Sequence, residues 1–159
     1  MSYSCTRKIE FDSAHRVMLH ESKCRNLHGH RYVAEVTCAA TDLDALGRVI
    51  DFSVIKSVLG KWVDHYWDHG TILNSKDYDL IELCQTKGWK HYTLDGVNPT
   101  AEVMAEYLCK VGNSILTNAG VQVVSVRLYE TPNCWSDWIA KEGNGDAVLT
   151  QLEKERWGK

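Results

Sequence analysis

The stretch from Cys24 to Ala40 restricts the fold most, because two closely spaced histidines lead directly into a strand-like run. From Arg31 onward, RYVAEVTCAA alternates between two sets of residues with the period of two that is typical of a half-buried strand. In extended backbone, residues two apart project to the same side. His28 and His30 can therefore direct their rings to one point, and Gly29 leaves room between them.

These two histidines have the spacing of metal ligands. His15, in FDSAHR, lies where the first strand ends, and a hairpin between the two strands would bring its ring to the same point. Three histidines with an open fourth position are typical of a catalytic zinc, which acts as a Lewis acid. Cys24 leaves a second interpretation open, because a thiolate as fourth ligand would close the site and make it structural.

The remaining periodicities predict an α+β fold. Apolar residues recur every three or four positions from Asp51 to about Tyr66, which predicts a helix. A second helix is expected to begin at Asn98 as its cap, with Pro99 in the first helical position, and to end before Gly120. Strands are predicted at residues 2–11, 31–40, 121–129 and 134–139. This order, ββααββ, predicts an antiparallel sheet with two helices on one face.

No repeat or linker-like segment divides the chain, so we expect a single domain over residues 1–140. Residues 75–97 fit the plan poorly and are interpreted as an excursion, with a short helix near Tyr78 to Cys84. Residues 141–159 are interpreted as a C-terminal extension with a short amphipathic helix around Val148 to Trp157. A chain of 159 residues can bury roughly 70% of its unfolded surface, so its core does not require a metal.

The charge balance argues against two classes of partner. A formal net charge of -3 gives no electrostatic footprint for nucleic acid or for an anionic membrane.

The N-terminal MSYSCTRKIEF has no apolar signal segment, and no apolar stretch reaches the roughly 20 residues that cross a bilayer. The six scattered cysteines are expected to remain thiols in a reducing compartment. We therefore expect a cytoplasmic protein whose partners are small molecules and its own copies.

Further groups are candidates for chemistry. Asp68 and His69 are adjacent at the expected end of the first helix, and a carboxylate that orients an imidazole is a common way to activate a thiol. Both can act on one atom only if the backbone bends there. Glu130 follows a strand, and its carboxylate can accept two parallel hydrogen bonds from a guanine or pterin ring, or simply be solvated. Cations around the histidine loop would suit a phosphorylated substrate, and they are Arg16, Lys23, Arg25 and Arg31.

Six segments, taken in order, resemble one known family, that of the 6-pyruvoyl-tetrahydropterin and 6-carboxy-tetrahydropterin synthases. The resemblance covers most of Tyr3 to Ile139, and the combination is specific although each segment alone is not. The segments are FDSAHR, CRNLHGH, GRVIDFSVIK, WDHGTILN, NPTAEVMAEYL and RLYET.

The resemblance implies a role for each candidate residue. The implied zinc ligands are His15, His28 and His30. The implied catalytic residues are Cys24 as proton acceptor, relayed with Asp68 and His69. The implied pterin-binding residues are Glu130, which anchors the ring, and Thr100 and Glu102 near it. The implied architecture is the tunnelling fold, in which several subunits, commonly six, assemble into a β-barrel with active sites between subunits.

The spacing between the cysteine and HGH indicates the product within this family. Cys24 and His28 form CxxxHGH, which resembles the bacterial 6-carboxy-tetrahydropterin synthases of queuosine and 7-deazaguanine biosynthesis. The implied reaction is that of a zinc-dependent lyase, which converts 7,8-dihydroneopterin triphosphate into 6-carboxy-5,6,7,8-tetrahydropterin, acetaldehyde and triphosphate. Formation of 6-pyruvoyl-tetrahydropterin is the alternative within the family. A non-catalytic, zinc-stabilised module that binds a pterin or purine is the alternative from another class.

Overall fold

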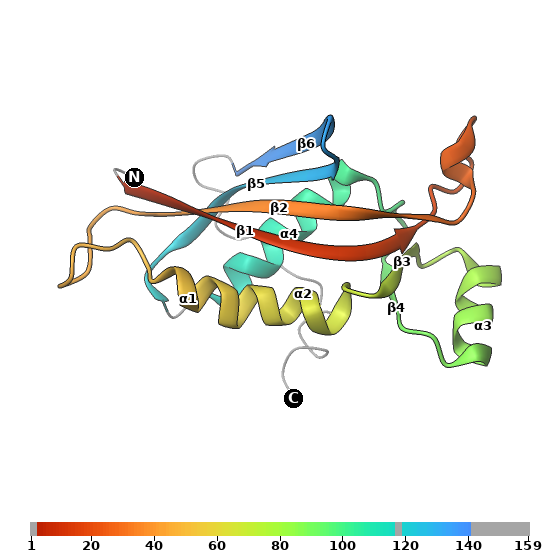
Figure 1. Cartoon of the computed structure of the whole chain (residues 1–159), viewed down its shortest axis with the longest axis horizontal. Coiled ribbons are helices and arrows are strands. Elements are labelled where there is room, and N and C mark those ends of the chain that lie inside the picture. The colour runs from red at the N-terminus through yellow and green to blue at the C-terminus, as the bar shows by residue number, and fades with distance from the viewer. Residues whose placement is uncertain (1–2, 117–118, 141–159) are drawn as a thin grey trace.

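A single six-stranded sheet organises the molecule, which we describe from a computed structural model over residues 3–116 and 119–140. The strand order across the sheet is β4-β3-β1-β2-β5-β6 (Figure 1). The strands are β1 (Tyr3–His15), β2 (His28–Ala40), β3 (Gly70–Asn74), β4 (His91–Leu94), β5 (Gln122–Thr131) and β6 (Cys134–Ile139). The long β1–β2 hairpin lies at the centre of the sheet, so its two strands position the groups that follow.

Two helical segments cover one face of this sheet, as the sequence predicts (Figure 1). The first is continuous over α1 (Phe52–Ile55), a π-helical turn (Lys56–Gly60) and α2 (Lys61–Tyr66), and the second is α4 (Ala101–Ile115). Phe11 and Tyr32 from the sheet pack with Leu59, Trp62 and Leu108 from these helices in one buried cluster. No helix in the described part of the chain is both long and apolar enough to span a membrane.

The four strands that the sequence predicts pair in antiparallel fashion, β1 with β2, β2 with β5 and β5 with β6. Two additional strands make the whole sheet mixed, because β3 joins β1 and β4 joins β3 in parallel. The expected short helix of the excursion is confirmed as α3 (Tyr78–Lys87), which lies beyond β3 and β4 at one end of the molecule (Figure 1). The predicted C-terminal extension and its helix lie outside the described residues.

The start of α4 differs from the prediction. Its cap is Thr100, whose Oγ1 accepts a hydrogen bond from the Val103 N–H at 3.4 Å. Asn98 is not the cap, because its side chain bonds both the N–H and the C=O of Met18 at 3.0 Å. The segment before α4 is thereby attached to the loop that follows β1. Gly120 has φ +68 where the chain leaves α4, as its predicted role in this turn requires.

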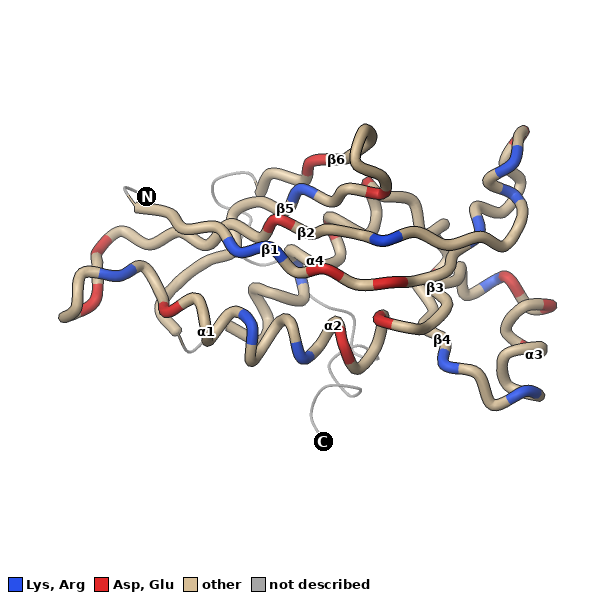
Figure 2. Tube along the Cα trace, viewed as in Figure 1, with Lys and Arg blue, Asp and Glu red and all other residues tan. Residues whose placement is uncertain are grey.

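The strands of the sheet carry charged residues of both signs (Figure 2), and several of them form exposed pairs on the face opposite the helices. Lys8 pairs with Glu35 across β1 and β2 at 3.0 Å, and Arg127 pairs with Asp137 across β5 and β6 at 2.7 Å. Such exposed pairs contribute little to stability, about 0 to 1 kcal/mol each. This face is therefore a solvated surface, and the apolar core lies on the helix side.

Candidate active site

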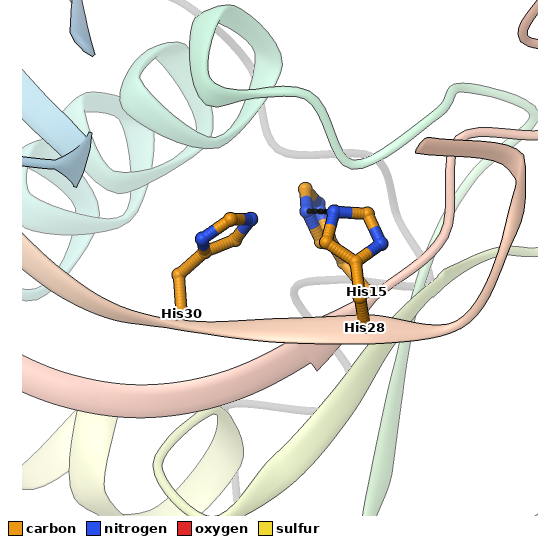
Figure 3. Close-up of side chains that lie close together, drawn as sticks. All are labelled: His15, His28 and His30. Atoms are coloured by element: carbon orange, nitrogen blue, oxygen red, sulfur yellow. Dashed lines mark hydrogen bonds between the residues drawn. The ribbon is translucent and has the colours of Figure 1, made fainter. Parts of the chain in front are cut away.

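The end of the β1–β2 hairpin brings three histidines together on the core side of the sheet (Figure 3). His15 is paired directly across the hairpin with His28, and Ser13 is paired with His30. Because alternate residues of a strand share a face, all three rings project to the same side. One ring nitrogen from each histidine lies within 4.8 Å of the other two.

The hydrogen bonds of two of these rings fix the position of their protons. Nδ1 of His15 lies 2.7 Å from the carbonyl oxygen of Pro99, and Nδ1 of His28 lies 2.8 Å from that of Asn26. A carbonyl oxygen can only accept, so each Nδ1 carries the proton and donates it. In the neutral rings, both Nε2 atoms are then bare acceptors, and they face each other at 3.2 Å.

The surrounding groups add further acceptors rather than donors. The buried Nε2 of His30 makes no hydrogen bond to the described residues. Oε1 of Glu130 lies 3.3 Å from Nε2 of His15 and 3.6 Å from Nε2 of His30. Burial lowers the pKa of His15 and of His30, which favours the neutral, ligating form. Lone pairs that converge in this way are stabilised by a bound cation, and three imidazoles suit zinc.

Gly29 makes the close approach of the two strands possible. A Cβ at this position would lie 3.0 Å from the carbonyl oxygen of Ser13 on β1. The glycine is therefore needed for contact between the strands, and not only for room between the two histidine rings as the sequence suggested. A side chain here would push β2 from β1 at the position where His15 and His28 meet.

A cavity of about 210 Å³ is lined by four of the predicted site residues. These residues are Cys24, Thr100, Glu102 and Glu130. Five residues without a predicted role complete its walls, and they are Val17, His20, Ala101, Cys134 and Trp135. His20 could not be predicted, because the loop that carries it has no periodicity. Trp135 lies at the start of the predicted strand 134–139, but the strand pattern does not show that this end of β6 meets the cavity.

An irregularity in strand pairing directs Glu130 toward the histidines. Tyr129 pairs with Trp135 and Thr131 with Cys134, so Glu130 is the extra residue in a bulge of β5. Bulges re-aim side chains and are frequent beside active sites. Nearby, hydrogen bonds from its own backbone N–H and from Thr100 and Ser136 hold the pKa of Glu102 below its usual value, although burial opposes them. The cavity therefore carries two carboxylates, one of them held in the ionised form.

Asp68 and His69 form a pair of their own at the edge of β1. Oδ2 of Asp68 lies 2.6 Å from Nδ1 of His69, while its Oδ1 accepts a hydrogen bond from the Asp12 N–H at 2.9 Å. Burial alone would raise the pKa of Asp68, but these two hydrogen bonds hold it below its usual value. The predicted backbone bend falls on His69 itself, with φ +54. Among the described residues, neither side chain bonds Cys24 or lines the cavity, and the His69 side chain is 78% exposed.

Comparison with known proteins gives this arrangement a family. The sequence profile described as 6-pyruvoyl tetrahydropterin synthase matches residues 4–140. The chain belongs to this family. A protein of Rickettsia conorii named 6-carboxy-5,6,7,8-tetrahydropterin synthase is 45% identical over 135 residues, covering 82% of this chain and 96% of the relative. A Haemophilus influenzae protein of the same name is 30% identical over 143 residues, covering 86% of this chain and 98% of the relative.

Solved structures confirm the tunnelling fold. The chain is similar to an uncharacterised protein from Wolinella succinogenes, with a TM-score of 0.75, 22% identity and coverage of 87% of this chain and 98% of the other. It is also similar to the 6-pyruvoyl tetrahydropterin synthase of Caenorhabditis elegans, with a TM-score of 0.64, 24% identity and coverage of 87% and 96%. Both likenesses extend over nearly the whole described chain, so the mixed six-stranded sheet is a member of this fold.

Two of the four cations near the histidine loop, Arg16 and Arg31, are engaged by carboxylates away from the cavity. Arg16 makes a two-pronged ion pair with the buried Asp77, with N–O distances of 2.7 and 2.5 Å. Arg31 projects to the other face of the sheet and pairs with Asp12 at 2.6 Å and Glu10 at 3.0 Å. Arg16 instead attaches the end of β1 to the start of α3.

Proposed function

We propose that this chain converts 7,8-dihydroneopterin triphosphate into 6-carboxy-5,6,7,8-tetrahydropterin, with zinc bound by His15, His28 and His30. The observation that carries the proposal is the convergence of the three ring nitrogens beside the cavity that Cys24 and Glu130 line. The names of relatives at 42–45% identity support the carboxy-forming reaction. The zinc-dependent lyase chemistry and a role in queuosine or 7-deazaguanine biosynthesis belong to the same proposal.

Zinc held by three imidazoles would act as a Lewis acid on an oxygen of the substrate side chain. The protein supplies the remaining functions. Pro99 and Asn26 hold the rings of His15 and His28 with their bare nitrogens toward the ion. Glu130 accepts hydrogen bonds from the N–H and NH2 groups of the pterin ring, and Thr100 and Glu102 form the wall beside it.

In this proposal Cys24 is the base that moves protons of the substrate side chain. It lies on the short 3-10 turn Lys23–Arg25 and lines the cavity, whereas the three-nitrogen metal group among the described residues does not include it. A thiol in the cavity but outside the metal group can accept and return a proton. This position favours catalysis over the alternative in which Cys24 completes a structural zinc site.

The proposed assembly is a homo-oligomer, a hexamer in line with the family resemblance, with active sites between copies. One chain encloses about 210 Å³, below the range of about 300–1,000 Å³ that is common for ligand pockets. Asp68 and His69 do not line this cavity, and in the proposed assembly the His69 side chain, which is 78% exposed, would act at the cavity of another copy. We place this enzyme in the cytoplasm, as the sequence predicts, with residues 1–140 as its catalytic domain.

A product assay tests the proposal. The zinc-loaded chain is incubated with 7,8-dihydroneopterin triphosphate, and the pterin products and acetaldehyde are identified by mass analysis. We expect 6-carboxy-5,6,7,8-tetrahydropterin and an equal amount of acetaldehyde. A pyruvoyl product without acetaldehyde would support the alternative within the family, and no turnover at all would contradict both enzyme functions.

The Cys24→Ala variant, assayed beside the wild type, separates enzyme from structural module. As a catalytic base, Cys24 should be dispensable for folding and for zinc, and its loss should lower turnover by roughly 100- to 10,000-fold. As a fourth zinc ligand, its loss should instead remove the metal and lower the melting temperature. Cys84→Ala, at a buried thiol of α3, is the matched control for substitution of a cysteine.

A further inference from the structure

The loop between β1 and β2 is folded so that three of its residues, Val17, His20 and Cys24, line the same cavity. The N–H of Val17 donates to the carbonyl oxygen of Cys24 at 2.9 Å, which closes the loop across its base. Within it, the N–H of His20 donates back to Val17 at 3.3 Å in a tight turn. His20 and Cys24 both line the cavity, although three residues separate them and only Cys24 lies in the 3-10 turn Lys23–Arg25.

The turn before His20 contains an unfavourable backbone conformation. Leu19 has φ +63, which L-amino acids with a branched side chain rarely adopt, and its side chain is 98% exposed. The Leu19 side chain is exposed, so its burial does not offset the energetic cost of the positive φ. Strained residues of this kind are concentrated at functional sites. Here the effect of the turn is to direct the next residue back toward the cavity.

The ring of His20 has a fixed proton position. Its Nδ1 accepts a hydrogen bond from the N–H of Ser22 at 2.9 Å. The proton of the neutral ring is therefore on Nε2. Among the described residues no acceptor bonds that Nε2–H, so the ring presents a free donor.

This donor complements the rest of the cavity, whose walls include the carboxylates of Glu102 and Glu130. Carboxylates accept hydrogen bonds and therefore select the N–H and NH2 side of a ring. His20 shares its loop with Cys24, the proposed base for the side chain of the substrate, and so lies at the side-chain end. A donor at this end suits an oxygen acceptor of the ligand, either a hydroxyl or a phosphate oxygen.

We propose that His20 is a substrate-binding residue, whose Nε2–H donates a hydrogen bond to an oxygen on the side chain of the bound pterin. This inference rests on the proposed function, since it takes the pterin as the ligand. His20 contributes binding and orientation, while proton transfer stays with Cys24. The substitution His20→Gln should preserve much of the interaction, because the glutamine amide can place an N–H near the position of Nε2.

Steady-state kinetics with 7,8-dihydroneopterin triphosphate test this role in the wild type, His20→Ala and His20→Gln. We expect His20→Ala to raise KM by roughly 3- to 10-fold, the effect of one hydrogen bond, with kcat and zinc content nearly unchanged. His20→Gln should recover most of the loss. His91→Ala is the control, because His91 also has a single backbone partner at Nδ1 but does not line the cavity.

Binding of the dephosphorylated 7,8-dihydroneopterin, followed by pterin fluorescence, identifies the acceptor. A similar loss of affinity in His20→Ala for both compounds indicates a hydroxyl, and a loss only for the triphosphate indicates a phosphate oxygen. Leu19→Gly should bind normally, because glycine adopts positive φ without strain. The proposal is overturned if His20→Ala keeps the KM and affinity of the wild type, or if it lowers kcat alone and changes its pH profile.

The same binding measurement separates failure of this inference from failure of the proposed function. If the wild type binds 7,8-dihydroneopterin triphosphate but forms no product, the proposed reaction is wrong, and the affinity of His20→Ala still decides the role of His20. If the wild type does not bind the compound at all, both are overturned.

Discussion

The end of the β1–β2 hairpin carries the three histidines, and the segment just before β3 carries Asp68 and His69. The two regions are built in opposite ways. Two of the three histidine rings at the hairpin, those of His15 and His28, donate to backbone carbonyls, and His15 is only 1% exposed. The imidazole of His69 is held by one neighbour, Asp68, and is 78% exposed. The first arrangement is a preformed site within one chain, whereas the second presents a polarised ring outward.

The Asp68–His69 ion pair does not by itself stabilise the second arrangement. An exposed ion pair contributes about 0 to 1 kcal/mol. The positive φ of His69 costs of order 1–3 kcal/mol, which the pair does not offset by itself. Two hydrogen bonds to the backbone of Asp12 hold this bend, at 2.9 Å to Asp68 Oδ1 and at 2.7 Å from the His69 N–H, but neither involves the His69 imidazole. The outward direction of that ring is therefore more readily explained by an action on something outside the chain.

Loss of a metal ligand should have the largest effect. We expect His28→Ala to reduce zinc from about one ion per chain to a small fraction, because two remaining imidazoles bind zinc weakly. Turnover should fall by roughly a thousandfold or more, since the Lewis acid supplies several kcal/mol. Zinc content by elemental analysis and the product assay measure both effects.

His91→Ala is the matched control for this substitution, because it removes a histidine of β4 that lies outside the metal group. It should retain both zinc and activity. Full zinc content in His28→Ala would contradict a three-histidine metal centre. The end of the β1–β2 hairpin would then not be a preformed metal site.

Substitution in the outward-facing Asp68–His69 pair should have a smaller effect on activity than loss of a metal ligand, and it should leave the metal in place. We expect His69→Ala to lower kcat by roughly 100-fold, as for loss of a group that assists proton transfer, with unchanged zinc content. His65→Ala, four residues earlier in α2, is the control on the same segment. Loss of zinc in His69→Ala would show that the two regions are not functionally separate.

Mixing of inactive variants shows whether the pair serves another copy. Chains with Cys24→Ala and chains with His69→Ala are unfolded or dissociated together and reassembled in equal amounts. If each active site combines Cys24 of one copy with His69 of another, about a quarter of the sites regain both residues and the activity returns in proportion. If both residues act within one chain, the mixture stays as inactive as its components.

The sequence was sufficient to predict that the three histidines lie together, because a single rule connects their positions to the fold. The period of two places His28 and His30 on one face, and the hairpin register adds His15 opposite His28. The partners of these rings could not be predicted in this way. Pro99 contacts His15 across 84 positions, and only the packed structure defines such a contact.

The other differences between the sequence-based predictions and the structure also arise from packing, strand register and contacts between distant parts of the chain. Local propensity makes Asn98 as good a cap as Thr100, and tertiary hydrogen bonds to Met18 decide between them. The parallel strands β3 and β4 are short, five and four residues long, and carry too few residues for a period to be recognised. The bulge at Glu130 and the turn at Leu19 depend on register and strain, which residue types alone do not express.

Glu130 lies on β5, on the opposite side of the hairpin from the Asp68–His69 pair, and its replacement should have the smallest effect of the three. One carboxylate oxygen is 3.3 Å from Nε2 of His15, while the residue also lines the cavity, so it is either a ring anchor or a further metal ligand. As an anchor, Glu130→Gln should raise KM by roughly 10- to 100-fold, the effect of a hydrogen bond to a charged group, with zinc unchanged. Glu35→Gln on the outer face is the control and should change neither value. A loss of zinc in Glu130→Gln would instead assign the carboxylate to the metal, and the preformed site would then extend from the hairpin to β5.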